Sequence, residues 1–286
     1  MLKIVEKKKI WFTISILIIV IGFGFMFTKG MNFGIDFRGG TQVVINMGTD
    51  FNKTDVDKIV DEYSKDAVTN QVNGTELQIK AKELNSSQVN DIFKALKEKY
   101  DLKDDALVSQ NEIGASVGRD LTTNAIVALV IAVIGMLIYV VIRFEFSFGI
   151  AAIIALLHDV LITISVYAVF GITINTPFIA AILTIVGYSI NDTIVIFDRI
   201  RENRKKLRGK SVEEIADMSI TQTMSRSINT TLTTLITIVC VYIFVPTVRD
   251  FAFPLIVGIA SGACSSIFIA SPIWCILACL LYTSPS

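Results

Sequence analysis

The sequence is poor in charged residues. Only 18% of its 286 residues are Asp, Glu, Lys or Arg, whereas 52% are hydrophobic, and the mean hydropathy is +0.62. A soluble domain of this length carries a larger charged fraction on its surface. The composition therefore excludes an ordinary soluble domain and indicates an integral membrane protein.

Cysteine is also scarce. The four cysteines lie in the last two apolar runs, and the one long polar segment, 29–123, contains none. A disulfide framework is therefore excluded from that segment. Cys275 and Cys279 share a helical face, but two thiols without a third ligand are more typical of packing than of a metal site. We expect neither a metal nor another cofactor.

Signatures of nucleotide and nucleic-acid binding are lacking as well. The pair Gly39-Gly40 has no Walker lysine or nucleophile nearby. Segment 29–123 contains 12 Lys or Arg residues and 16 Asp or Glu residues, an acidic excess that gives no sign of nucleic-acid binding. Because no nucleotide-binding motif is present, any energy-driven function of this protein is expected to use an ion gradient and not a nucleotide.

Six apolar runs reach the roughly 18 residues that a helix needs to cross about 30 Å of hydrocarbon. We predict spans over residues 10–28, 124–142, 146–170, 177–198, 227–246 and 252–282. The predicted organisation is a short N-terminal segment with a retained first span (1–28), a polar domain (29–123), five further spans (124–282) that include a basic loop (199–226), and a tail (283–286).

Basic residues gather beside three of these spans, and they set the predicted orientation. They are Lys3, Lys7, Lys8 and Lys9 before the first, Arg143 after the second, and Arg199, Arg201, Arg204, Lys205, Lys206, Arg208 and Lys210 after the fourth. Because basic loops stay in the cytoplasm, we predict cytoplasmic termini and an external 29–123 segment. The basic run after the fourth span is expected to contact anionic membrane lipid.

Segment 29–123 alternates between strand-like and helix-like periodicity. The expected elements are a strand at 41–47, a helix at 56–63 capped by Thr54, two strands within 72–81 around an Asn73-Gly74 turn, a helix at 89–96 and a returning stretch at 106–117. This β-α-β-β-α-β order predicts a small ferredoxin-like α+β domain.

Asp192 stands inside the fourth predicted span, next to Asn191. Removing a carboxylate from water costs several kcal/mol unless the group is paired, protonated or hydrated. An ionisable residue in such a place is therefore taken as functional by default. The alternative is a structural carboxylate bonded to nearby backbone or hydroxyl groups.

Polar residues follow one helical face in three predicted spans. These faces are Asp159, Thr163 and Tyr167 beside His158 in the third span, Thr184, Tyr188, Ser189 and Asp192 in the fourth, and Arg226, Asn229, Thr230, Thr233 and Thr237 in the fifth. We expect the three faces to meet in a hydrated cavity, where protonation of a carboxyl shifts the helix packing.

Each of these residues also has a simpler interpretation. Threonines in membrane helices often bond to their own helix backbone, Arg226 can extend to the nearby cytoplasmic surface, and His158 can stabilise a helix contact instead of relaying protons. Gly258 and Gly262 have the small-xxx-small spacing that lets two helices approach closely.

Three motifs occur in order along the chain. They are Gly34-Ile35-Asp36-Phe37-Arg38-Gly39-Gly40-Thr41, Leu157-His158-Asp159, and Gly187-Tyr188-Ser189-Ile190-Asn191-Asp192 running into Asp198-Arg199-Ile200-Arg201-Glu202-Asn203. With the six spans and the single large loop, they closely resemble the SecF branch of the SecD/SecF family of bacterial protein export, over nearly the whole chain. The tail 281–286 departs from that family because it lacks basic residues.

The resemblance implies a six-span half of an RND-type transporter in the bacterial cytoplasmic membrane. Such a half pairs with SecD beside the SecYEG translocon, with YajC and YidC as further partners. The family uses the proton motive force, or sodium in some relatives, to promote late stages of polypeptide translocation. The translocating polypeptide and membrane lipid are thus further expected partners.

The resemblance also assigns ion coupling to Asp192 and Arg226. Together with the polar faces, it defines a candidate site of ion-coupling residues (Asp192, Arg226, Asn191, Asp159 and His158), a polar path (Ser189, Tyr188, Thr230 and Thr233) and a family motif (Gly34, Asp36, Gly39 and Gly40). The motif glycines are expected to form a tight turn, with Asp36 bonding a backbone amide.

Two other functions remain as alternatives. A structural assembly subunit would use its polar faces only to hold a partner. An intramembrane aspartyl protease would use Asp159 and Asp192 as an acid/base dyad, but the setting Tyr-Ser-Ile-Asn-Asp differs from Gly-x-Gly-Asp, and Arg226 would have no role. We therefore predict a subunit that is not an enzyme.

Overall fold

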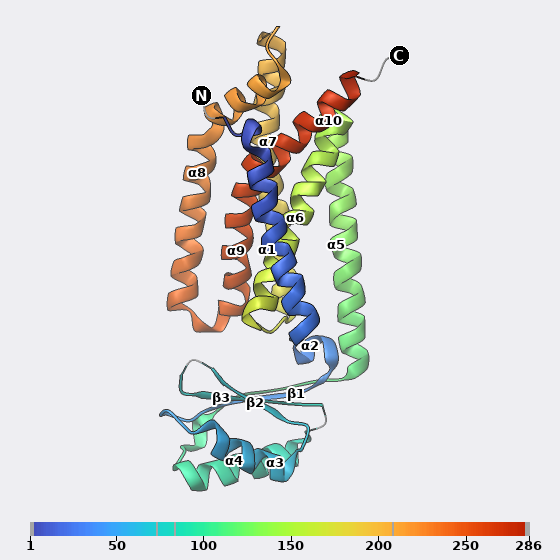
Figure 1. The fold of residues 1–286 in the computed structure, drawn as a ribbon. Coiled ribbons are helices and arrows are strands. Elements are labelled where there is room, and N and C mark those ends of the chain that lie inside the picture. Colours follow the sequence, from blue (N-terminus) through green and yellow to red (C-terminus); the bar gives the residue numbers. More distant parts are fainter. Residues whose placement is uncertain (1–2, 73, 83, 208, 284–286) are drawn as a thin grey trace. The chain divides into compact units, whose positions relative to one another are not determined.

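The computed structural model describes residues 3–72, 74–82, 84–207 and 209–283. It divides into two compact units, one formed by the residues up to 32 together with those from 126 onward, and the other formed by Phe33–Ala125. Figure 1 shows that the first unit is built of long helices and that the second is a small sheet with helices on one face.

Six segments of the described chain are long and apolar enough to cross a membrane. They contain α1 (Lys8–Lys29), α5 (Ala115–Arg143), α6 (Phe146–Phe170), α7 (Thr176–Lys206), α8 (Val212–Phe244), and a sixth segment made of α9 (Arg249–Ser265), a π-helical turn (Ser266–Ala270) and α10 (Ser271–Thr283). The predicted six-span helical membrane bundle is thus confirmed.

Two of these helices extend beyond their apolar runs. Most of the segment predicted as a basic loop, 199–226, is helical, because α7 continues to Lys206 and α8 begins at Val212. Ser211 starts α8 with a capping box, in which its hydroxyl accepts from Glu214 N and the Glu214 carboxylate accepts from Ser211 N. The end of an apolar run marks the edge of the hydrocarbon, not the end of a helix. Arg208 of this segment lies outside the described residues.

The start of the chain is attached to α8. The Asp217 carboxylate accepts the backbone N–H groups of Ile4 at 3.0 Å and Val5 at 2.9 Å, and Lys8 pairs with Glu213 at 3.2 Å. Ile4 and Val5 are buried in the bundle core. These contacts connect the residues just before α1, and Lys8 at its start, to the first turns of α8.

One part of the bundle core is aromatic, where Phe148 stacks on Trp274 with ring centroids 4.8 Å apart. Another part is a close contact between α7 and α9. A Cβ atom added to Gly258 would lie 2.2 Å from the Ile185 side chain, so α9 approaches α7 as closely as the small-residue spacing predicts. This approach brings side chains of α9 within reach of polar groups on α6 and α7.

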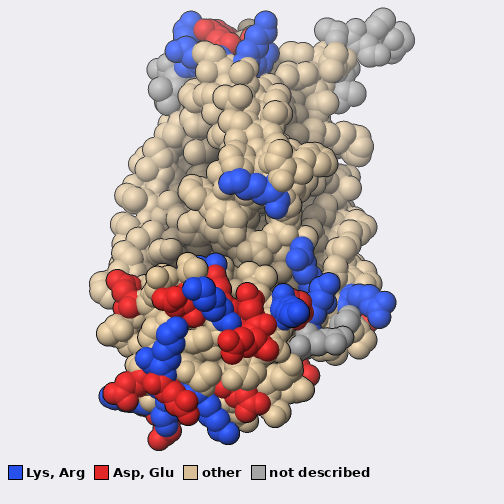
Figure 2. Space-filling view, turned by 60° about the horizontal axis from the view of Figure 1, so that its bottom comes forward, with Lys and Arg blue, Asp and Glu red and all other residues tan. Residues whose placement is uncertain are grey.

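The second unit contains a four-stranded antiparallel sheet in the order β2-β3-β1-β4. Its strands are β1 (Gly40–Asn46), β2 (Val68–Val72), β3 (Glu76–Ala81) and β4 (Leu107–Ile113), and the helices α3 (Lys53–Tyr63) and α4 (Ser86–Tyr100) follow β1 and β3. This is the ferredoxin-like arrangement that the sequence predicts. Figure 2 shows basic and acidic side chains interspersed on its surface.

Some details of this unit differ from the sequence-based expectation. Asn52, not Thr54, caps α3, because the Asn52 side chain accepts the Thr54 N–H at 3.0 Å. β2 begins at Val68, four residues before the predicted strand, because it buries the polar Thr69 and exposes Val68 and therefore lacks the usual hydrophobic alternation. Asn73 of the expected turn lies outside the described residues, and Gly74 has φ of +83°.

Candidate functional site

One buried carboxyl lies where α6, α7 and α9 meet. Asp159 on α6 has none of its surface exposed. Its Oδ1 accepts from His158 Nδ1 at 3.0 Å and from Ser261 Oγ at 2.7 Å. Its Oδ2 accepts from Ser189 Oγ at 2.6 Å and from Ser265 Oγ at 2.7 Å. Four donors satisfy both oxygens, so this buried carboxyl is fully hydrogen-bonded to the surrounding helices.

His158 extends this network to the first span. Its Nε2 lies 2.8 Å from Ser15 Oγ on α1, while its Nδ1 faces Asp159. With the proton on Nδ1, the ring donates to the carboxylate and accepts from the serine. The Asp159 network therefore connects α1, α6, α7 and α9.

A glycine allows this network to close. A Cβ atom added to Gly262 on α9 would lie 3.0 Å from Ser189 Cβ on α7. The absence of a side chain at this position lets Ser189, Ser261 and Ser265 approach Asp159 together. The sequence analysis missed the two α9 serines, although their i, i+4 spacing in an apolar run is a detectable signal.

A second buried carboxyl lies between α7 and α8, and its surroundings differ. Asp192 keeps only 6% of its surface exposed. Its carboxyl lies next to the Ser227 hydroxyl and within electrostatic reach of Arg226, yet its Oδ2 is buried without a hydrogen-bond partner among the described residues. Asn191 is exposed and does not share this environment. Asp192 is therefore a buried acid with an unsatisfied oxygen.

The polar residues of α8 divide into two faces. Arg226, Thr230 and Thr233 are exposed on this chain, and the two threonine hydroxyls donate to the carbonyls of Arg226 and Asn229. The buried face instead carries Ser227 and Thr231, which are 1% and 7% exposed. The predicted fifth-span face was therefore the wrong one for an interior cavity, and the hydroxyls beside Asp192 were missed.

The three predicted polar faces consequently do not form one cavity. On α7, Ser189 is bonded to Asp159, whereas Tyr188 donates to Thr230 O at 3.2 Å and to Thr234 Oγ1 at 3.0 Å on α8. Thr184 is exposed. Helix α7 thus separates two sites, one around Asp159 and one around Asp192.

An open cleft of about 330 Å³ continues the α7–α8 seam beyond Asp192. Asp198 in its wall pairs with Arg143 at 3.5 Å, and Arg199 bonds to Glu202 at 2.6 Å. The cleft is lined by Val195, Asp198, Arg199, Glu202, Gln222, Thr223 and Arg226. Arg226 thus stands between the cleft and the buried carboxyl.

The family-motif residues lie in the sheet domain and build a turn. Gly39 and Gly40 have φ of +74° and +127°, and a Cβ atom on Gly40 would lie 2.5 Å from the Ala81 carbonyl oxygen. Gly34 precedes the short helix α2 (Ile35–Arg38), which contains Asp36. Gly39 and Gly40 are therefore required by the backbone conformation.

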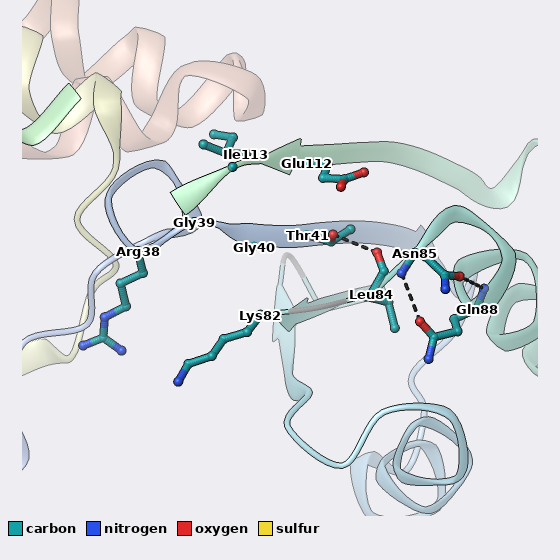
Figure 3. Close-up of a pocket in the computed structure, with 11 residues that line it drawn as sticks. Arg38, Gly39, Gly40, Thr41, Lys82, Leu84, Asn85, Gln88, Glu112 and Ile113 are labelled. Carbon is teal, nitrogen blue, oxygen red and sulfur yellow. Dashed lines mark hydrogen bonds between the residues drawn. The ribbon is translucent and has the colours of Figure 1, made fainter. Parts of the chain in front are cut away.

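A cavity of about 680 Å³ opens beside this turn. Figure 3 shows Arg38 and Lys82 extending to one side, with Glu112 on the opposite side of β1. The Thr41 hydroxyl donates to Leu84 O at 2.9 Å and closes one wall. The cavity is polar and belongs to the sheet domain alone.

The positions of the acidic side chains bear on two alternatives, a metal site and an aspartyl protease dyad. Within the described part of the chain, no group of three or more His, Cys, Asp or Glu side chains is placed to hold a metal ion. Asp159 is surrounded by three serines and His158, whereas Asp192 faces Ser227 and Arg226. The two carboxyls belong to separate sites, and this separation argues against a dyad that shares one proton.

Comparison with known proteins agrees with this architecture. The family described as "Protein export membrane protein SecD/SecF, C-terminal" matches residues 92–279, and the "SecD/SecF GG Motif" matches residues 24–51. A protein translocase subunit SecF from Sebaldella termitidis is 40% identical over 284 residues, which cover 95% of this chain and 90% of the relative.

Two longer relatives contain this architecture as a part. SecDF of Bacillus subtilis is 35% identical over 94% of this chain and 37% of its own length. The crystal structure of SecDF from Thermus thermophilus superimposes with a TM-score of 0.88 at 33% identity, over 98% of this chain and 39% of that one. The chain belongs to the SecD/SecF family of protein export membrane proteins, as its three motifs indicate.

Proposed function

We propose that this chain is an accessory subunit of protein translocation that couples cation movement at Asp192 to polypeptide export. The coupling is supported chiefly by one observation, the buried Asp192 carboxyl with an unpartnered oxygen beside Arg226. Its relatives are named protein translocase subunits, which supports the export role. A carboxyl in this setting is stabilised when it binds a cation and destabilised when it releases one.

The two buried carboxyls suit different roles. A coupling residue must alternate between two states of similar free energy. Asp159 accepts four hydrogen bonds, so protonating it or pairing it with a cation would break contacts between three helices. Asp192 has no such network, and Arg226, which acts electrostatically on Asp192, lines a cleft between α7 and α8. Cation exchange is therefore assigned to Asp192, and Asp159 is assigned to holding the bundle together.

Arg226 stabilises the second state of the proposed exchange, in which no cation is bound to Asp192. Its guanidinium lies within electrostatic reach of Asp192 and is exposed at the cleft. An arginine keeps its charge at physiological pH, so it stabilises the empty carboxylate and is repelled when a cation occupies the site. Binding and release would thus change the preferred separation of α7 and α8.

The exposed polar face of α8 supports a membrane-embedded partner. Asn229, Thr230, Thr233 and Thr237 are exposed along a helix that is apolar enough to span a membrane. Polar side chains inside a bilayer preferentially face protein or water. In the Bacillus subtilis and Thermus thermophilus relatives, this chain matches slightly over one third of a SecDF polypeptide. We assign the facing surface to a SecD subunit.

The remaining assignments rest on charge and on the relatives. Lys3, Lys7, Lys8 and Lys9 precede the first span, which supports the proposal that both termini are cytoplasmic, by the positive-inside rule. The membrane is then the bacterial cytoplasmic membrane, with the sheet domain outside. The proton or sodium motive force would drive the cation inward through Asp192 and assist polypeptide leaving the SecYEG channel.

Reconstituted export tests the proposal. Proteoliposomes containing the translocon, a SecD partner and either wild-type protein or Asp192→Asn are compared for export of a secretory polypeptide, with and without an imposed ion gradient. The wild type should show gradient-stimulated export, and Asp192→Asn should export only at the unstimulated rate. Its insertion and SecD association should remain intact, because Asn is nearly isosteric with Asp.

Asp250→Asn is the matched control. Asp250 is an exposed carboxyl on α9 that accepts a hydrogen bond from Asn175, away from the α7–α8 seam. Its substitution should leave stimulation unchanged. Full stimulation by Asp192→Asn would reject ion coupling at this residue and favour the purely structural subunit.

A further inference from the structure

The polar cavity beside the Gly39-Gly40 turn has no part in the proposed ion coupling. Its volume of about 680 Å³ lies in the range of ligand-binding sites in proteins. The described residues that line it include two basic side chains, Arg38 and Lys82, and one acidic side chain, Glu112. Figure 3 shows Arg38 and Lys82 extending to one side, with Glu112 across β1 from them. One side of the cavity is therefore positively charged.

The glycine turn brings the two basic residues to the same cavity. Arg38 ends α2, and Lys82 directly follows β3. A Cβ atom on Gly40 would lie 2.5 Å from the Ala81 carbonyl oxygen, so β1 can begin this close to the end of β3 only with a glycine at that position. The family motif thus places two cationic side chains beside one cavity.

The N-terminal end of α4 forms another wall of the cavity. The Asn85 side chain accepts the Gln88 N–H at 2.9 Å, and the Gln88 side chain accepts the Asn85 N–H at 3.0 Å (Figure 3). A helix of 15 residues carries a partial positive charge at this end. That charge adds to those of Arg38 and Lys82, so the cavity favours an anion that accepts several hydrogen bonds, such as a phosphate group.

Both chain connections between the sheet domain and the membrane spans contribute to this cavity. Residues 38–41 follow the first span, and residues 112–114 directly precede α5. Helix α5 continues without a break into the second membrane-spanning segment, and about 15 Å of helix separates Gly114 from the apolar run that begins at residue 124. The lipid headgroup layer lies between the two, and long basic side chains commonly extend toward such a layer.

The segment that contains Arg38 has the composition of a membrane-interface segment. Phe33 is 41% exposed. The centre of its ring lies 5.7 Å from the Arg38 guanidinium carbon and 6.3 Å from the centre of the Phe37 ring. Aromatic and basic residues together in a short segment are typical of chain that lies among lipid headgroups. These features favour the membrane as the source of the anion.

We propose that this cavity binds the phosphate group of an anionic phospholipid, with Arg38 and Lys82 as its cationic ligands. A zwitterionic choline headgroup is disfavoured, because it would bring a third positive charge next to these two. The site does not involve Asp192 and goes beyond the proposed function. A bound headgroup would attach the sheet domain to the membrane surface by a contact additional to its two chain connections.

Hydrogen exchange of the full-length protein in nanodiscs tests the proposal. Exchange of the peptide 84–89, which contains the start of α4, is followed as phosphatidylglycerol replaces phosphatidylcholine. Wild-type protein should become protected as the phosphatidylglycerol fraction rises. Arg38→Gln and Lys82→Gln should each require about fivefold more phosphatidylglycerol for half-maximal protection, as expected for the loss of one basic residue near an anionic surface. Both side chains are exposed, so the fold should remain intact.

Two control variants should respond as the wild type does. Lys94→Gln makes the same charge change at an exposed residue of α4 that does not line the cavity. Asp192→Asn removes the proposed exchange site and leaves the sheet domain unchanged. Loss of gradient-stimulated export in Asp192→Asn therefore tests the proposed function alone, and loss of the lipid response in the cavity variants tests this site alone.

The proposal is overturned if phosphatidylglycerol gives no protection, if both cavity variants match the wild type, or if Lys94→Gln shifts the response as much as they do. Two soluble probes, glycerol phosphate and an acidic peptide, are added to phosphatidylcholine nanodiscs at the phosphatidylglycerol concentration that protects the wild type. Neither should protect peptide 84–89. Protection by glycerol phosphate would assign the cavity to a soluble phosphate, and protection by the peptide would assign it to a polypeptide; either result overturns the lipid assignment.

Discussion

Two of the buried carboxyls in the bundle, Asp159 on α6 and Asp192 on α7, have opposite environments. Asp159 is fully buried and accepts four hydrogen bonds from α6, α7 and α9. Asp192 is almost as deeply buried, but one of its oxygens has no partner in the described part of the chain. Burial alone therefore does not indicate function in a membrane helix. The number of donors around each carboxyl is what distinguishes the two, and under the proposed function the carboxyl with fewer donors is the exchange site.

The largest effect on stability is expected from Asp159→Ala. Removing the carboxylate leaves the Ser189 and Ser261 hydroxyls and His158 Nδ1 without their acceptor, and should lower the free energy of unfolding by about 3–5 kcal/mol. Denaturant unfolding of the purified protein in micelles measures this loss. Asp192→Ala, with no network to break, should cost less than half as much. Equal losses for the two variants would remove the distinction between the sites.

A smaller loss is expected from Ser189→Ala. The Ser189 hydroxyl donates to Asp159 Oδ2 at 2.6 Å, and a hydrogen bond to a charged acceptor contributes about 1.5–3 kcal/mol. Thr184→Ala on the same helix is the control, because its exposed hydroxyl bonds only to Ala180 O. It should change the unfolding free energy by less than about 0.5 kcal/mol. A similar loss in both variants would mean that the Asp159 network contributes little.

Arg226→Lys should change function with little effect on stability. The arginine is exposed, so the unfolding free energy should stay within about 0.5 kcal/mol of the wild type. Gradient-stimulated export should nevertheless fall, because an ammonium group differs from a guanidinium in reach and geometry. Export rates in proteoliposomes, compared at equal protein content, measure this. A wild-type rate would indicate that Arg226 only extends to the membrane surface.

The smallest effect concerns an acid outside the membrane segments. The Ser64 hydroxyl and the Lys82 backbone N–H, at 2.7 and 2.9 Å, hold the pKa of Asp66 below its ordinary value of 3.8. A lowered folded-state pKa stabilises the sheet domain above pH 3.8, and this contribution is lost as the pH falls further. Asp66→Asn should reduce stability by less than about 1 kcal/mol.

Hydrogen exchange of the peptide containing Lys82 checks this prediction. Wild-type protein should lose its advantage over Asp66→Asn as the pH is lowered from 7 to 3, since the carboxylate becomes protonated. If wild-type protein and Asp66→Asn exchange at the same rate at both pH values, the Asp66 contacts do not stabilise the sheet domain. Asp66, like Asp159, is a carboxyl that accepts hydrogen bonds from nearby donors. Because Asp66 lies at the surface, its contribution to the free energy of unfolding is expected to be smaller.

The fold was largely predictable because it follows from local patterns. Apolar runs of sufficient length predict the six spans, and the alternation of strand and helix periodicity predicts the β-α-β-β-α-β domain. Helix ends were less predictable: the amphipathic extensions of α7 and α8 bury residues such as Ile200 and Ile220 beyond the apolar runs. Long-range packing, which no local window contains, determines how far these helices continue.

The site was only partly predictable for a related reason. Asp192 is evident as a carboxyl in an apolar run, but its neighbours depend on helix rotation. The sequence offers two polar faces on α8, one with Arg226, Thr230 and Thr233 and another with Ser227 and Thr231. Only the packing of α8 on α7 and α9 selects the second as the buried one. Likewise, Ser261 and Ser265 acquire a role only because Gly262 lets α9 approach Asp159.

The hydrogen bonds from Ile4 and Val5 to Asp217 attach the chain just before α1 to α8. A displacement of α8 would strain these contacts just before α1, whose 22 residues span about 33 Å. The other end of α1 is joined by a few residues to the sheet domain, which begins at Phe33. The contacts with α8 and the connection to the sheet domain therefore lie at opposite ends of one continuous helix.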